Sequence, residues 1–170
     1  MNSRAGLGAA ALLIALAQTP AIGADTATLD KYVELLRSDL KADKTALLTE
    51  ALALSDAEGK AFWPIYREYD TELSAWGDAR YSLLKQYAKA YNADVVTDDI
   101  ATDLAKRFMD LQKQRADLVA KYYKKIAKEV SPMRGAQFLQ AEHQISLLVD
   151  LAIASEVPFL EKSNAVATDK

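Results

Sequence analysis

Apolar residues recur every three or four positions over most of the chain, which is the period of an amphipathic α-helix. The pattern predicts four helices, over residues 29–54, 56–91, 98–129 and 132–155. The links between them are short, so successive helices must return antiparallel. We therefore expect an all-α fold built from long antiparallel helical hairpins.

The second predicted helix has the clearest start. Ser55 and Glu58 form a capping box, in which the hydroxyl accepts from the backbone N–H three residues on and the carboxylate reaches back to the Ser55 N–H. Pro64 lies inside this helix and has no N–H to donate to the carbonyl of Lys60. We expect either a kink near Lys60 or a break into two helices.

The third predicted helix carries an apolar seam that Arg115 interrupts once: Ile100, Leu104, Phe108, Leu111, Leu118, Tyr122, Ile126 and Val130. Four opposite-charge pairs at a spacing of four residues should support it: Asp103 with Arg107, Lys106 with Asp110, Lys113 with Asp117, and Asp117 with Lys121. Arg115 is expected either to extend to solvent or to meet an acid of the first or second helix. The fourth helix has an apolar surface wider than a stripe, which predicts that it is sandwiched or meets a partner.

The start of the second helix recurs at the start of the fourth. Val130, Ser131, Gly135 and Phe138 match Leu54, Ser55, Gly59 and Phe62 position for position, and Val96 with Thr97 opens a looser third copy. Each full copy offers a hydroxyl N-cap, a small residue where two helices approach and an apolar anchor, and Pro132 stands at the permissive first helical position. The sequence leaves open whether this is an internal duplication or a common form of helix start.

The N-terminus is typical of a secretory signal peptide. Met1–Ala24 combines the basic Arg4, an apolar run too short to span a bilayer and a tail of small residues suited to cleavage. An uncleaved anchor is the alternative. The chain has no Cys, which excludes a lipoprotein anchor, disulfides and thiol catalysis. We expect a periplasmic protein with one helical domain over 25–160, a flexible tail over 161–170 and no stable membrane insertion after cleavage.

Charge is distributed unevenly around a net value of −3. Bases outnumber acids between Ile100 and Arg134, and acids outnumber bases on either side. Attraction between the basic segment and the acidic segments favours an antiparallel arrangement of the helices. Because the acidic segments can neutralise the basic one, the charge distribution argues against nucleic acid as a partner.

Catalytic constellations are missing from the sequence. There is no nucleophile with a base, no nucleotide-binding glycine pattern, and a single His, His143, so one chain cannot assemble a histidine or cysteine metal site. The alternative is a metal site shared between two chains at a dimer interface, formed by His143 with Glu142 and Asp150. We expect no cofactor and no enzymatic activity. We also expect the acids of the second helix to face solvent: Glu68, Asp70 and Glu72.

The remaining candidate site is a set of aromatic and basic residues on the second helix. They are Trp63, Tyr66, Tyr69, Trp76, Tyr81, Lys85, Tyr87 and Lys89. Aromatics at helical spacing usually pack in a core. These are too many for one face, however, and a partly exposed aromatic and lysine surface suits protein binding of low specificity.

Two short motifs resemble a known family. Leu54-Ser55-Asp56-Ala57-Glu58 is similar to the L-T-x-x-Q motif of the periplasmic LTXXQ-motif family typified by Spy and CpxP, and Val130-Ser131-Pro132-Met133-Arg134 looks like its second copy. Ser replaces Thr in both copies, Glu58 replaces Gln in the first and Arg134 replaces Gln in the second. The segment 138–160 also looks like a C-terminal signature of secreted helical proteins in this group.

The resemblance implies a four-helix, hairpin-based fold that pairs into a curved homodimer. Its concave face would hold unfolded or partly folded proteins without ATP. We therefore expect an ATP-independent chaperone or envelope-stress accessory protein. The alternative is a dedicated regulatory partner of a sensor kinase periplasmic domain or an envelope complex, without general chaperone activity.

Overall fold

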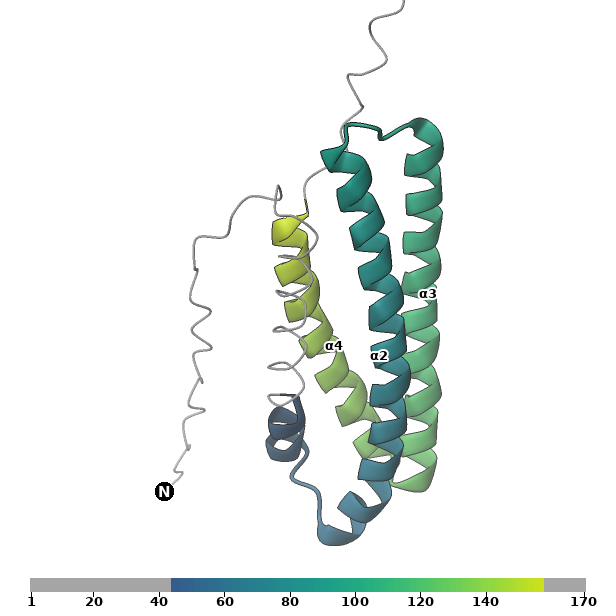
Figure 1. Ribbon diagram of the computed structural model, residues 1–170. Helices are drawn as coiled ribbons and strands as arrows, with labels where there is room; N and C mark the ends of the chain where they lie inside the picture. Colours follow the sequence, from purple (N-terminus) through teal and green to yellow (C-terminus); the bar gives the residue numbers. More distant parts are fainter. Residues whose placement is uncertain (1–43, 158–170) are drawn as a thin grey trace, which may run out of the picture.

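The computed structural model describes residues 44–157, and this part consists of four helices without strands (Figure 1). Residues 44–52 form a short helical segment, followed by α2 (Asp56–Asn92), α3 (Asp98–Glu129) and α4 (Pro132–Glu156). The all-α prediction is confirmed. The predicted signal peptide, the first part of the first predicted helix and the tail over 161–170 lie outside the described residues.

Hydroxyl side chains cap all three long helices, as the sequence predicts. Ser55 and Glu58 form the complete capping box of α2, Thr97 accepts from the Ile100 N–H, and Ser131 accepts from the Arg134 N–H. Helix α2 runs through Pro64 without interruption for 37 residues. The predicted break into two helices therefore does not occur.

Helix α3 packs against both α2 and α4, and α2 and α3 form a long antiparallel hairpin (Figure 1). The apolar seam predicted for α3 is buried or half-buried except at Phe108, which is 52% exposed. The prediction was wrong at that position, because the core divides into two clusters and neither includes Phe108.

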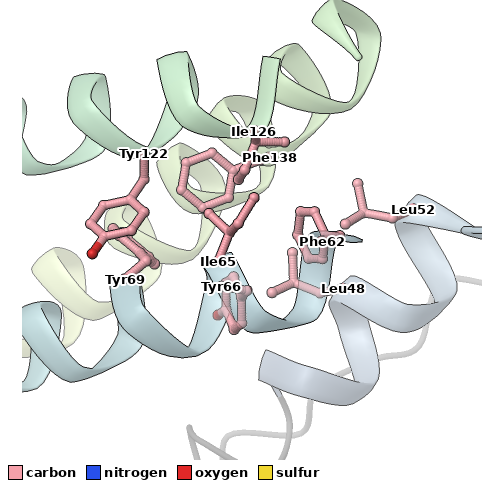
Figure 2. Close-up of a cluster of buried hydrophobic side chains, with 9 residues drawn as sticks. All are labelled: Leu48, Leu52, Phe62, Ile65, Tyr66, Tyr69, Tyr122, Ile126 and Phe138. Atoms are coloured by element: carbon pink, nitrogen blue, oxygen red, sulfur yellow. The ribbon is translucent and has the colours of Figure 1, made fainter. Parts of the chain in front are cut away.

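The larger of these two clusters lies where the 44–52 helix, α2, α3 and α4 meet (Figure 2). Its buried members are Leu48, Leu52, Phe62, Ile65, Tyr66, Tyr69, Tyr122, Ile126 and Phe138. The ring of Phe138 meets those of Tyr66 and Tyr69 edge to face, with the centres of the Tyr69 and Phe138 rings 5.0 Å apart. A smaller cluster of Leu83, Leu104 and Leu111 joins α2 to α3.

The two motif glycines differ in their surroundings. A Cβ at Gly135 would lie 3.0 Å from the Cβ of Ala127, so this glycine lets α4 approach the backbone of α3, as predicted. A Cβ at Gly59 would meet only the indole of Trp63, at 3.6 Å. The predicted approach of two helices is therefore right for the second copy and wrong for the first.

Candidate functional site

The predicted aromatic surface on α2 divides between the core and the surface. Tyr66 and Tyr69 are buried, 4% and 0% exposed, so a partner cannot reach them in this fold. Trp63 is half-buried and packs against the same core cluster, with its ring 5.2 Å from Phe62. The core interpretation is therefore correct for the two tyrosines, and Trp63 remains accessible.

The two buried tyrosines belong to a polar cluster inside the bundle. The hydroxyl of Tyr69 donates to Glu142 at 2.6 Å, and that of Tyr66 donates to the same carboxylate at 3.4 Å. The Nζ of Lys44 lies 2.9 Å from Glu142, whose side chain is 1% exposed, and Arg115 approaches to 3.9 Å. Burial, and next the charge of Glu142, raise the pKa of both phenols well above their ordinary value.

Sequence reasoning missed this cluster. Lys44 lies in a charged patch of the first predicted helix, and a lysine is rarely buried. Its spacing of four residues from Leu48, and of eight from Leu52, was the available signal, because it places all three on one helix face. Arg115 meets an acid of α4, whereas the prediction placed that acid on the first or second helix.

Trp76 is held in place by polar contacts. Its indole N–H donates to the carbonyl of Leu111 at 2.9 Å, and the guanidinium groups of Arg80 and Arg115 lie over its ring at 5.5 and 4.9 Å. Arg80 is also paired with Asp150 of α4 at 2.6 Å. These contacts assign Trp76 to packing between α2, α3 and α4.

The candidates near the end of α2 are more accessible. Tyr81 and Lys85 are half-buried, with the Lys85 ammonium 5.3 Å from the centre of the Tyr81 ring. Tyr87 is half-buried against the smaller core cluster, and Lys89 is exposed in the last turn.

The two copies of the motif meet in space. The guanidinium of Arg134 donates to both carboxylate oxygens of Glu58, at 2.8 and 3.0 Å, and to the carbonyl of Leu52 at 2.6 Å. Hydrogen bonds from Arg134, and then from Ser55, hold the pKa of Glu58 at about 2. Ser131 and Pro132 start α4, while Leu54 and Val130 pack beside the larger core cluster. The motif residues thus join two helix starts.

Two of the acids expected to face solvent also bridge α2 and α3. Glu72 accepts from Lys121 at 2.6 Å and from the Tyr122 hydroxyl at 2.8 Å, and Glu68 accepts from Lys125. Lys121 therefore bonds Glu72 instead of the predicted Asp117. The other three predicted pairs within α3 are present.

An exposed apolar patch lies on the second half of α4. Its members are Leu147, Leu148 and Leu151, which are 55%, 59% and 69% exposed. Leu151 lies three residues after Leu148 and four after Leu147, which places the three side chains on one side of the helix. We call these three residues the α4 patch.

An open groove lies where the 44–52 helix turns into α2. It is lined by Thr49, Ala53, Leu54, Ser55, Asp56, Gly59, Lys60, Trp63, Pro64 and Arg67. The pyrrole edge of Trp63 stands over Gly59, because a Cβ on that glycine would lie 3.6 and 3.7 Å from Cδ1 and Nε1 of the indole. We call this feature the Trp63 groove.

Comparisons with known proteins give no match: no family model fits the chain, and neither the curated proteins nor the solved structures contain a significant relative. Among residues 44–157, no three His, Cys, Asp or Glu side chains cluster as metal ligands would. In the same range, no helix has the length and hydropathy needed to cross a membrane.

Proposed function

We propose that this protein binds other proteins through exposed apolar surface and holds unfolded or partly folded chains without ATP. The observation that carries the proposal is the α4 patch. Three leucines of one helix side are each more than half exposed. Contiguous apolar surface of this kind is typical of sites where proteins interact.

The chemistry of the patch suits clients of many sequences. Burying apolar area contributes about 25 cal/mol per Å² and has no directional requirement, so leucine side chains accept any apolar segment. An unfolded chain exposes such segments along its length. The N-terminal pattern of a signal peptide supports the periplasm as the place where these clients are met.

The test is binding to a labelled, permanently unfolded client, followed by fluorescence anisotropy. Replacing Leu148 and Leu151 together by Gln should weaken binding about tenfold or more, because two large apolar contacts are lost. The matched control is Leu139→Gln, because Leu139 is also exposed on α4 but lies about two helical turns before the patch. Unchanged affinity in the double variant, with its helicity intact, would contradict the role of the patch.

A dedicated regulatory partner would give a different result. Such a protein would form one tight complex with its target and would show no saturable affinity for the unfolded client. That outcome would favour a dedicated regulatory role over the general holding of unfolded chains.

A further inference from the structure

Two polar groups of the residues that line the Trp63 groove each lack one expected hydrogen-bond partner. Pro64 has no N–H, so the carbonyl of Lys60 is without its α-helical hydrogen bond. The indole N–H of Trp63 has no acceptor among the described residues. One carbonyl without its α-helical donor and one indole N–H without an acceptor therefore belong to residues that line the same groove.

These two groups complement a peptide group. The N–H of an extended peptide can donate to the Lys60 carbonyl, and a peptide carbonyl can accept from the Trp63 indole. Gly59 keeps this place open, because it puts no side chain against the N–H edge of the indole.

The walls and rim of the groove narrow the class of peptide. Leu54, Ala53 and Pro64 provide apolar walls beside the indole ring. Lys60 and Arg67 are exposed, and neither has an ion-pair partner within residues 44–157. Asp56 is the one acid among the lining residues. The rim thus carries net positive charge and favours a ligand with carboxylates.

We propose that the Trp63 groove binds an extended peptide segment in which apolar residues are flanked by acidic ones. The apolar side chains lie against Trp63 and Leu54, the backbone bonds to the Lys60 carbonyl and the Trp63 N–H, and the acids meet Lys60 and Arg67. This inference rests on the proposed function, because it names the class of segment by which a client protein would be recognised.

The test uses the indole N–H resonances in a ¹⁵N–¹H correlation spectrum of the full mature chain. The sequence has two tryptophans, and the Trp76 indole, bonded to Leu111, serves as an internal reference. The probe is a blocked eight-residue peptide with a central Leu-Phe pair flanked by glutamates, and its control has lysines in place of the glutamates. We expect the Trp63 resonance to shift saturably with the acidic peptide while that of Trp76 stays fixed. A fixed Trp63 resonance, or equal binding of the basic peptide, would overturn the proposal.

A matched pair of glycine substitutions tests the geometry. Gly59→Ala adds a methyl at ordinary contact distance from the indole, so the chain should fold normally, but the methyl crowds the N–H edge. We expect peptide affinity to fall about tenfold, as for the loss of one good hydrogen bond. Gly77→Ala, where nothing lies within 4 Å, should leave affinity unchanged. Equal affinity in Gly59→Ala and the wild type would overturn the binding mode.

Failure of this inference is distinguishable from failure of the proposed function. A chain that holds no unfolded client but gives the selective Trp63 shift would overturn the proposed function and leave the groove as a peptide site. A chain that holds clients but shows no shift would overturn the groove alone.

Discussion

The ammonium of Lys44 and the carboxylate of Glu142 form an ion pair 2.9 Å long inside the bundle, with side chains only 6% and 1% exposed. The pair joins Lys44, the first described residue of this helix, to the middle of α4. The other end of the same helix is fixed to α4 by Arg134, which donates to the Leu52 carbonyl. These two polar contacts thus hold the 44–52 helix against the aromatic core.

Breaking the buried pair should destabilise the protein strongly. Lys44→Met leaves the Glu142 carboxylate buried, with Arg115 only at 3.9 Å. We expect a loss of about 3–5 kcal/mol in the free energy of unfolding, measured by urea denaturation. The double variant Lys44→Met, Glu142→Gln should recover much of that loss, because no buried carboxylate remains and the amide oxygen can still accept from the Tyr69 hydroxyl. A loss below about 0.5 kcal/mol in the single variant would show that the pair behaves as an exposed one.

The Arg134–Glu58 contact should make stability depend on acid pH. The folded-state pKa of Glu58 is about 2, below its ordinary value of 4.5, so its contribution is complete above pH 4.5. The contribution is lost as the pH falls toward 2. Glu58→Gln should therefore flatten the decline of the urea midpoint between about pH 5 and pH 2. In an Arg134→Met background the same substitution should change the slope much less, and an equal change in both backgrounds would contradict the assignment.

Two glycine-to-alanine substitutions should have opposite effects on stability. At Gly135 the added methyl would lie 3.0 to 3.2 Å from the side chain and backbone of Ala127, so overpacking should cost about 1–3 kcal/mol. At Gly77 the methyl meets nothing, and the gain in helix propensity should stabilise by about 0.5–1 kcal/mol. Thermal unfolding followed by circular dichroism measures both. A stabilising Gly135→Ala would show that α3 and α4 can separate freely.

Pro64 should lower the stability of the protein and favour peptide binding at the Trp63 groove. Pro64→Ala restores the hydrogen bond to the Lys60 carbonyl, and we expect the free energy of unfolding to rise by as much as about 3 kcal/mol. The same substitution gives that carbonyl its α-helical donor, so peptide affinity at the Trp63 groove should fall. If Pro64→Ala is more stable and binds the peptide equally well, the Lys60 carbonyl does not accept a hydrogen bond from the peptide.

Local patterns predicted the helices well because their signals are local. Hydroxyl caps at Ser55, Thr97 and Ser131 set the starts of α2, α3 and α4, and apolar periodicity set their faces. The continuity of α2 through Pro64 was not predictable in the same way. Packing of Phe62, Ile65 and the buried tyrosines on both sides of the proline favours an unbroken helix over the local penalty.

The candidate site was less predictable because burial depends on partners distant in sequence. Trp63 and Tyr66 both lie on α2, yet only Tyr66 is buried and bonds to Glu142, 76 residues away. The α4 patch shows the reverse case. The sequence shows that α4 is apolar on more than one side, whereas its exposed side is known only once α3 has been placed.

The most direct test of the proposed function is the aggregation of an unrelated unfolding protein, followed by light scattering with no nucleotide present. The chain without its predicted signal peptide, residues 25–170, is added at equimolar amounts. The proposal predicts suppression of aggregation that is lost in the Leu148→Gln, Leu151→Gln variant and kept in Leu139→Gln. Aggregation that proceeds unchanged beside the folded wild-type chain would contradict the holding function.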